Sequence, residues 1–370
     1  MTELEPYLNG AARDWHAPST LGSTLAFHRS IPGYAPTPLL QVEDLADDLG
    51  VGRLLVKVEA DRFGLPAFKV LGASWAVARA LTTRFTPGRQ VPPLPELVDQ
   101  LAGTPAVTLS TATDGNHGRA LARVGRWLGL PTRVYLPDGV STTAAGAIAA
   151  EGAEVIVVAG SYDHAVAVAA AAAAEPDQLL VQDTAWPGYQ DVPAWIVAGY
   201  GTLFAELDAQ LADLGVAPDL VVVPVGVGSL AQAAATHYRA GSSHRPSLLA
   251  VEPDTAAGLL ASLHAGHLVT VPTGTTVMTG LNCGTPSELA WPVLQGGLDA
   301  AAAVSDEQCR QAGEALAGRG LDVGPCGAAT LAGLRPVLHE ARCREALRLT
   351  DRSTVVLVST EGAAANPLPT

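Results

Sequence analysis

The sequence predicts an α/β protein with two open, twisted parallel sheets that carry helices on both faces. Strand-like apolar runs alternate with helical runs from about residue 105 onward, which is the pattern of a parallel sheet. Gly-rich segments follow several of the strand-like runs, where parallel sheets bind ligands. The 370 residues, 48% hydrophobic and 16% charged, are enough for two domains with cores of their own.

The N-terminal part contributes three predicted elements. A short acidic helix is expected over 42–49, and the apolar run RLLVKV predicts a buried strand over 53–58. The segment RFGLPAFKVLG at 62–72 then begins a helix directly after a Gly-Leu-Pro turn.

The rest of the chain continues the alternation. Strands are predicted at 106–109, 132–136, 154–158, 179–181, 219–225, 247–251 and 354–359. Helices are predicted at 119–128, 141–150, 164–174, 230–239, 307–317 and 328–339. We expect a smaller domain of residues 85–205, inserted into a larger one that residues 1–84 and 206–370 form together.

Charge and composition exclude several classes of protein. The net charge of −14 and the pI near 5.0 argue against nucleic acid or an anionic membrane as a partner. The most apolar run, at 165–174, is too short to span a bilayer, and the acidic, polar start is not a signal peptide. The four cysteines have neither metal-site spacing nor the density of a disulfide scaffold. We therefore expect a cytoplasmic protein with no bound metal.

Lys69 is the first candidate for a catalytic residue. The chain contains only two lysines, Lys57 and Lys69, because Arg supplies nearly all of the positive charge. A lysine amine can lose its proton and attack a carbonyl carbon, which a guanidinium cannot do. The positive end of a helix dipole next to Lys69 favours the free amine. The alternative is a surface lysine retained by chance.

Two Gly-containing loops follow predicted strands. TDGNHG, at 113–118, offers a carboxylate on Asp114 and an amide on Asn116, and its alternative role is a turn that caps the next helix. GVGSL, at 226–230, presents free backbone amides at a helix start, which bind anions. It lacks the lysine of a P-loop and the spacing of a dinucleotide fingerprint, and alone it is equally consistent with a tight turn.

Three further segments lie beside predicted strands or between them. VQDTAWPG, at 181–188, places Asp183 at a strand end as a second acid/base candidate, with a helix N-cap as the alternative. The last strand leads into STEG, at 359–362, and brings two hydroxyls to the same sheet edge. The Gly- and Pro-containing loop at 279–288 is a candidate cover for a site.

Taken together, these motifs resemble the fold-type II (tryptophan synthase β-like) pyridoxal-phosphate enzymes. A lysine, an Asn-containing loop, a Gly-rich phosphate loop and a hydroxyl on the last strand follow one another in this chain order. Within that group, the segments RFGLPAFKVLGAS, TDGNHGRALA, VQDTAWPGY, VGVGSLA, TGLNCGTP and VSTEG are most similar to the diaminopropionate ammonia-lyases. The resemblance runs from about residue 35 to residue 362.

The resemblance implies a role for each matching residue. Lys69 would form the Schiff base with pyridoxal 5'-phosphate, and Asn116 would bond the cofactor's phenolic oxygen. Ser359, or Thr360, would face the pyridine nitrogen, which leaves the ring neutral. The residues implied to bind the phosphate are Gly226, Val227, Gly228, Ser229 and Leu230.

The loop TDGN departs from the dehydratases, which carry a small residue where this chain has Asp114. A carboxylate there suits a substrate with a β-ammonium group. In the lyases, the residues matching Asp114 and Asp183 are the two acid/base groups, one for each enantiomer of diaminopropionate. With Thr113, they would also bind the substrate.

The leading functional hypothesis is therefore the pyridoxal-phosphate-dependent α,β-elimination of 2,3-diaminopropionate to pyruvate and ammonia. The alternative with the same cofactor is a β-replacement synthase or a dehydratase for another 3-substituted amino acid. A non-catalytic protein with this fold is a third possibility, against which the presence of Lys69, Asp114 and Asp183 argues. A small amino acid is the expected substrate, and a homodimer is the expected assembly.

Overall fold

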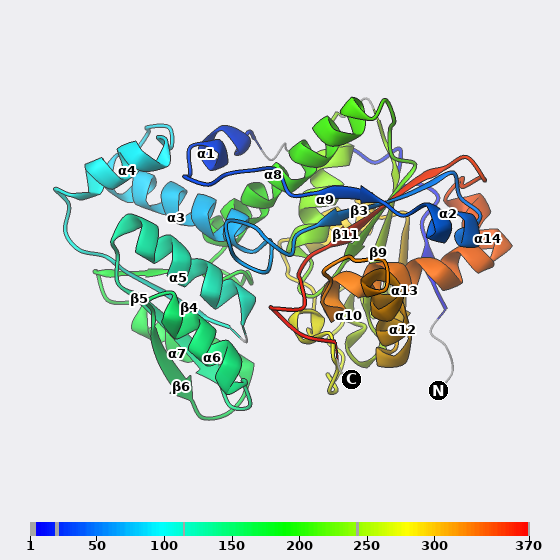
Figure 1. Ribbon diagram of the computed structural model, residues 1–370. Helices are drawn as coiled ribbons and strands as arrows, with labels where there is room; N and C mark the ends of the chain where they lie inside the picture. Colours follow the sequence, from blue (N-terminus) through cyan, green and yellow to red (C-terminus); the bar gives the residue numbers. More distant parts are fainter. Residues whose placement is uncertain (1–4, 19–21, 114, 242–243, 369–370) are drawn as a thin grey trace. The chain divides into compact units, whose positions relative to one another are not determined.

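The computed structural model describes residues 5–18, 22–113, 115–241 and 244–368. By its contacts the chain forms two compact units. Unit 1 comprises Met1–Gly22, Pro36–Ala67 and Leu203–Thr370, and unit 2 comprises Ser23–Ala35 and Phe68–Thr202 (Figure 1). Asp114, one of the two predicted acid/base residues, lies outside the described residues.

The unit boundaries differ from the expected domain boundaries after residues 84 and 205. They fall after residues 67 and 202 instead. The reason is helix α3 (Val70–Phe85), which packs against α5 (Asn116–Leu128) inside unit 2. Unit 2 also includes the short helix α1 (Leu25–Arg29), which we did not predict.

Unit 1 contains a seven-stranded sheet with the order β1-β10-β9-β8-β11-β3-β2. Its five central strands run parallel, as predicted, whereas the edge strands β1 and β2 pair antiparallel. The strands are β1 (Tyr7–Leu8), β2 (Leu39–Gln41), β3 (Arg53–Val58), β8 (Leu220–Pro224), β9 (Ser247–Pro253), β10 (Ala300–Val304) and β11 (Thr354–Ser359).

Alternate residues of these strands point to opposite faces of the sheet. On one face, side chains such as Leu54, Val222 and Leu357 build a core with α2 (Glu43–Leu49), α12 (Asp306–Ala317) and α13 (Pro325–His339). In the ribbon view, α12 and α13 lie side by side next to this sheet (Figure 1). The other helices of unit 1 are α9 (Ser229–Arg239), η1 (Asp254–Ala256), α10 (Gly258–Ala265), η2 (Thr279–Leu281), α11 (Trp291–Gly297) and α14 (Ala341–Ala346).

Unit 2 contains a parallel four-stranded sheet with the order β6-β5-β4-β7. One small core lies between the sheet and α7 (Tyr162–Ala172), and another lies between the sheet, α5 and α6 (Thr142–Ala150). Helices therefore cover both faces of this sheet, as predicted. The strands are β4 (Thr108–Ala112), β5 (Thr132–Pro137), β6 (Glu154–Val158) and β7 (Gln178–Leu180), and the remaining helix is α4 (Leu94–Leu101).

The longest helix, α8 (Asp191–Asp213), contributes residues to both units and was not predicted. The strand β10 was also missed, because its sequence AAAAV consists almost entirely of alanine, which has a low β propensity. Its burial between β9 and β1 makes it a strand in spite of that propensity.

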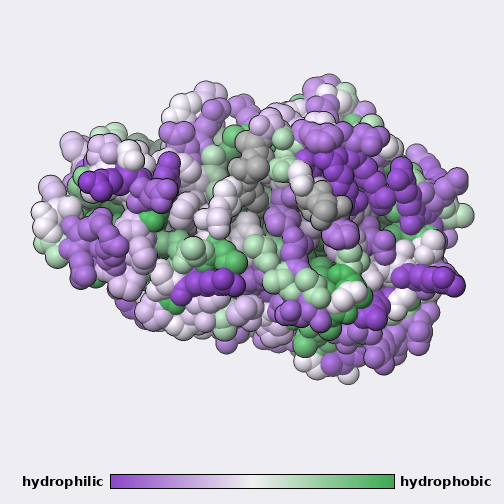
Figure 2. All heavy atoms as spheres, turned by 90° about the horizontal axis from the view of Figure 1, so that it is seen from above, coloured by the Kyte–Doolittle hydropathy of each residue, from purple (hydrophilic) through white to green (hydrophobic). Residues whose placement is uncertain are grey.

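The surface is consistent with the acidic composition. On the face seen in Figure 2, hydrophilic side chains are widespread and hydrophobic ones occupy small, separate areas. Among the described residues, no helix is long and apolar enough to cross a membrane.

Candidate active site

Lys69 and Asp183 form an ion pair inside unit 2. The Lys69 Nζ atom lies 2.8 Å from Asp183 Oδ2, and the two side chains are 23% and 10% exposed. Lys69 is the N-cap residue of α3, and Asp183 follows β7 at the carboxyl edge of the small sheet. The fold thus brings together two predicted residues that lie far apart in the sequence.

The charge of Lys69 determines the ionisation of Asp183. Burial alone would raise the pKa of this carboxyl group, but the charges of Lys69 and His117 and the hydrogen bond from Lys69 outweigh burial and lower the pKa to about 2. Asp183 is therefore a carboxylate at neutral pH. A carboxylate bonded to an ammonium group can exchange a proton with it, which is the basis of general acid–base catalysis.

Aromatic side chains enclose the amine of Lys69. The rings of Phe68 and Tyr200 lie 4.7 Å apart between centroids, and Lys69 Nζ lies 5.6 Å from the centroid of Phe68. Tyr200 comes from α8, and burial raises the pKa of its hydroxyl group to about 12. The amine therefore lies beside apolar rings and a neutral phenol, where water competes weakly for its bonds.

His117 is a neighbour of Asp183 that we did not single out from the sequence. Its Nε2 atom lies 2.7 Å from the carbonyl oxygen of Val181, and Nδ1 has no hydrogen-bond partner among the described residues. Burial lowers the pKa of His117, although the charge of Asp183 opposes this effect. The ring is therefore neutral with its proton on Nε2, because a carbonyl oxygen only accepts. Its position inside the motif TDGNHG was the available signal.

The loop after β4 carries two more predicted residues. Thr113 is buried, and its hydroxyl oxygen accepts a hydrogen bond of 3.0 Å from the amide of Gly115. Asn116 begins α5 at the carboxyl edge of the small sheet, which is the edge that Asp183 also occupies. Thr113 therefore stabilises its own loop, and Asn116 lies on the expected side of the sheet.

The predicted phosphate loop in unit 1 connects β8 to α9. Gly228 is the N-cap residue of α9 and has φ of 100°, a conformation that favours glycine. A Cβ atom on Gly228 would lie 2.7 Å from Leu294 Cδ1, and one on Gly226 would lie 3.0 Å from the carbonyl oxygen of Gly280. The helix start leaves its first amides without partners inside the helix, which suits an anion.

Ser359, at the end of β11, is the other predicted contact in unit 1. Its hydroxyl is completely buried and has no hydrogen-bond partner among the described residues. A Cβ atom on Gly327 would lie 2.4 Å from this Oγ atom, so only glycine leaves room for the hydroxyl. Thr360 is also buried. An unpaired buried hydroxyl is costly, which suggests that a ligand supplies the missing bond.

Lys57 belongs to a buried network in unit 1. Lys57 Nζ bonds the carbonyl oxygen of Thr37 at 2.8 Å, Glu206 at 3.0 Å and Gln210 at 2.9 Å. Arg62 bonds Glu206 and Glu59 in the same network, and all four charged side chains are at most 1% exposed. Lys57 is therefore held by structural partners and is no competitor of Lys69 as a nucleophile.

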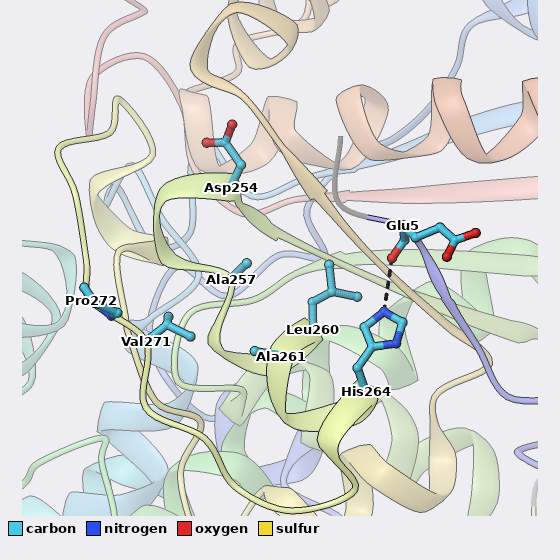
Figure 3. A pocket seen from close by; sticks show the side chains of 8 residues that line it. All are labelled: Glu5, Asp254, Ala257, Leu260, Ala261, His264, Val271 and Pro272. Atoms are coloured by element: carbon cyan, nitrogen blue, oxygen red, sulfur yellow. Dashed lines mark hydrogen bonds between the residues drawn. The ribbon is translucent and has the colours of Figure 1, made fainter. Parts of the chain in front are cut away.

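Two cavities lie away from these residues. One of about 310 Å³ in unit 1 is lined mainly by apolar side chains of α10 and the following loop, such as Leu260 and Val271. In Figure 3 the carboxylates of Asp254 and Glu5 point away from those side chains, and His264 bonds the carbonyl oxygen of Glu5 at 3.1 Å. The other, of about 460 Å³, lies in unit 2 beside Tyr189. None of the predicted site residues lines either cavity.

Comparisons with known proteins agree with the resemblance. The family model described as "Pyridoxal-phosphate dependent enzyme" matches residues 31–361. The diaminopropionate ammonia-lyase of Escherichia coli (strain K12) is 33% identical over 96% of this chain and 92% of its own length. The diaminopropionate ammonia-lyase of Salmonella typhimurium (strain LT2) is 34% identical over 98% and 93%.

Solved structures give the same result. The holo form of the E. coli diaminopropionate ammonia-lyase has a TM-score of 0.88 at 32% identity and covers 98% of this chain and 95% of its own. The same lyase in complex with an aminoacrylate-PLP azomethine reaction intermediate has a TM-score of 0.85 at 32% identity, over 98% and 94%. A threonine deaminase from the organism abbreviated T.th. has a TM-score of 0.72 at 29% identity, over 91% and 96%.

Proposed function

The chain belongs to the pyridoxal-phosphate dependent enzyme family, and we propose that it converts 2,3-diaminopropionate and water to pyruvate and two molecules of ammonia. The ammonia-lyases that support this substrate match the chain over nearly its whole length. The observation that carries the proposal is the ion pair of Lys69 and Asp183, because it combines a nucleophilic amine with a carboxylate that is ionised at neutral pH.

The residues present fit pyridoxal 5'-phosphate. The start of α9 presents backbone amides from a loop where a Cβ atom on Gly228 would not fit, and Ser359 holds a buried hydroxyl without a described partner. In this proposal Lys69 holds the cofactor's aldehyde carbon, Asn116 its phenolic oxygen, and Ser359 or Thr360 its ring nitrogen. The phosphate binds the five loop residues Gly226, Val227, Gly228, Ser229 and Leu230. When bound, the cofactor withdraws electrons from the substrate's α-carbon.

Lys69 and Asp183 then divide the proton transfers. The amine of Lys69 is displaced by the substrate's amine, and it is afterwards available to carry a proton. Asp183 accepts the α-proton from one face of the substrate, since its low pKa keeps it ionised until that moment. The substrate's β-ammonium group leaves as ammonia. Water finally releases the second nitrogen from the three-carbon product, which becomes pyruvate.

Asp114 extends the scheme to the second enantiomer. A single carboxylate cannot reach the α-proton on both faces of a planar intermediate, because proton transfer requires hydrogen-bond distance and alignment. We assign the L form to Asp183 and the D form to Asp114. Thr113 supports the loop that carries Asp114 through its bond to Gly115.

The test measures pyruvate release from each pure enantiomer. Asp183→Asn is expected to lower the rate on L-diaminopropionate by about 10²–10⁴-fold, the usual loss when a general base is removed. Asp114→Asn is expected to lower the rate on the D form by a similar factor. Equal losses on both enantiomers in both variants would contradict the assignment. If the wild type binds the cofactor but releases no pyruvate from either enantiomer, β-replacement or dehydration of another 3-substituted amino acid takes the place of the proposal.

A second test addresses the cofactor site alone. Gly228→Val is expected to weaken cofactor affinity strongly, because the added atoms meet Leu294 and the backbone conformation favours glycine. Ser229→Ala is expected to cost less, about 1–2 kcal/mol for one bond to a charged group. Equal cofactor affinity in the wild type and Gly228→Val would show that the phosphate binds elsewhere.

The proposal includes a setting and an assembly. We place the enzyme in the cytoplasm as a homodimer, without nucleic acid or membrane as a partner. No disulfide joins the four cysteines, all of which lie in the described part of the chain, and this suits a reducing compartment. Light scattering on the purified protein and fractionation of cells test the two points separately.

A further inference from the structure

A buried histidine connects three distant segments of unit 2. His28 Nδ1 lies 2.6 Å from Thr202 Oγ1, at the end of the α8 segment that belongs to this unit. His28 Nε2 lies 3.0 Å from the carbonyl oxygen of Leu71 and 3.2 Å from Ser74 Oγ, in the first two turns of α3. The imidazole is completely buried. Together with Thr24, these residues form what we call the His28 cluster, and the proposed chemistry uses none of them.

The hydrogen bonds of the His28 cluster have one consistent direction. The carbonyl oxygen of Leu71 only accepts, so Nε2 of the neutral ring carries the proton and Nδ1 accepts from the hydroxyl of Thr202. The Thr202 oxygen lies 2.8 Å from Thr24 Oγ1, which therefore donates to it. All of these side chains are buried. The chain of donors starts at Thr24 and ends on the backbone of α3.

Two glycines bring the same turn of α3 into backbone contact with α8. A Cβ atom on Gly199 would lie 2.4 Å from the carbonyl oxygen of Leu71, which is the oxygen that His28 bonds. A Cβ atom on Gly72 would lie 2.6 Å from the ring of Tyr200. The first turn of α3 is therefore held by close packing on one side and by the His28 cluster through its carbonyl group.

This turn begins at Lys69. Lys69 is the N-cap of α3 with helical dihedral angles (φ −53°, ψ −26°), and it lies two residues before Leu71. A rotation of the first turn would move Nζ relative to Asp183, to which it now lies at 2.8 Å. The position of the amine thus depends on groups that never touch it.

We propose that His28 and Thr202 are positioning residues, which hold the first turn of α3 so that the Lys69 amine stays aligned with Asp183. The catalytic consequence rests on the proposed function, whereas the alignment itself is a property of unit 2. A misplacement of about 1 Å at a reacting group can cost about 10²-fold in rate.

Two substitutions of Thr202 provide a matched pair. Thr202→Val keeps the shape of the side chain but removes the hydroxyl, so His28 Nδ1 loses its donor. Thr202→Ser keeps the hydroxyl and removes only a methyl group. His28→Ala removes all the bonds of the ring and is expected to lower the melting temperature strongly, so the conclusions rest on the Thr202 pair.

The first readout needs neither cofactor nor substrate. The full-length, cofactor-free protein is labelled with acetic anhydride at constant pH, and acetylation of its two lysines is followed by mass spectrometry. Lys69 is expected to react several-fold faster in Thr202→Val than in the wild type or Thr202→Ser, because its amine spends less time bonded to Asp183. Lys57 is completely buried and serves as the internal reference for intact folding.

The second readout is the kinetics of the cofactor-loaded enzyme. Thr202→Val is expected to lower kcat by about 10–10²-fold at nearly unchanged KM, and Thr202→Ser is expected to stay within about twofold of the wild type. A lower melting temperature in Thr202→Val, with unchanged Lys69 labelling and unchanged kcat per bound cofactor, would overturn the proposal and leave the His28 cluster a stabilising element only. Failure of the wild type to act on diaminopropionate would refute the proposed substrate but leave the labelling test valid.

Discussion

The two lysines of this chain occupy contrasting environments, one in each unit. Lys57 is completely buried in unit 1 and bonds Thr37, Glu206 and Gln210. Lys69 in unit 2 is 23% exposed and pairs with the carboxylate of Asp183. Both are strand-end or helix-start residues next to apolar runs, so their local sequences alone do not separate them.

The contrast shows what distinguishes a structural lysine from a reactive one. Burial lowers the pKa of Lys57, although the charges of Glu59 and Glu206 oppose this effect, and the amine cannot leave its partners without stranding a buried carboxylate. Lys69 can leave Asp183 at less cost, because the surroundings of this pair are partly open to water. A nucleophile has to exchange partners during each turnover, and only Lys69 is in a position to do so.

The largest expected effect breaks the comparison at Lys69. Lys69→Arg keeps the positive charge beside Asp183, but a guanidinium does not attack a carbonyl carbon. We expect loss of the visible absorption of the bound cofactor and a fall in kcat of about 10⁴–10⁶-fold, as for other enzymes without their nucleophile. Spectra and pyruvate assays measure both. Residual turnover near the wild-type rate would mean that another amine serves.

The next largest effect concerns Lys57 and falls on stability. Lys57→Met leaves Glu59 and Glu206 with only Arg62 as a buried cation, and breaking such a network costs about 3–5 kcal/mol in the free energy of unfolding. Urea denaturation measures this loss, and kcat per bound cofactor is expected to remain that of the wild type.

A charge-balanced double variant is the control for Lys57. Glu206→Gln in the Lys57→Met background removes one anion together with one cation, so the double variant should be less destabilised than the sum of the two single variants. Strict additivity would indicate that the two side chains do not interact, in contradiction to the distance of 3.0 Å between them.

A smaller effect concerns the pH dependence of the Lys69 pair. The pKa of Asp183 falls from the usual 3.8 to about 2 in the folded protein, so the pair stabilises the cofactor-free protein at pH values above about 4. This contribution, about 2 kcal/mol, is lost as the pH falls from about 4 to 2, because protonation then becomes favourable in the unfolded chain first. The difference in unfolding free energy between the wild type and Asp183→Asn should shrink over this range. A constant difference would contradict the lowered pKa.

The smallest effect tests the rim of the Lys57 network. Thr37 Oγ1 donates to Glu59 at 2.6 Å and accepts from Arg62 at 3.1 Å. Thr37→Val keeps the volume but removes both bonds, at an expected cost of about 1–2 kcal/mol in stability with unchanged activity. Thermal and urea denaturation measure the cost, and a loss of activity per bound cofactor would link this network to the chemistry.

Much of the fold followed from local patterns. Every predicted strand has a counterpart in the structure within a few residues, because continuous apolar runs bounded by turn residues are typical of buried parallel strands. The predicted helices were found as well. The misses were β10, made of alanines, and α8, whose starting residues follow a Pro-Gly turn and carry no strong apolar period. The burial that decides both comes from other parts of the chain.

The sequence by itself determined the kinds of chemistry available: a lysine among arginines, glycines before a helix, and hydroxyls after a strand. Only the tertiary structure decided which groups meet. Asp183 reaches Lys69, and Thr202 reaches His28 and through it Leu71, because helix packing and strand order bring these distant segments of unit 2 together. The physical reason is that an amine or imidazole has no partner preference readable from its neighbours in sequence. Its partner is whichever polar group the packed core leaves within hydrogen-bond distance.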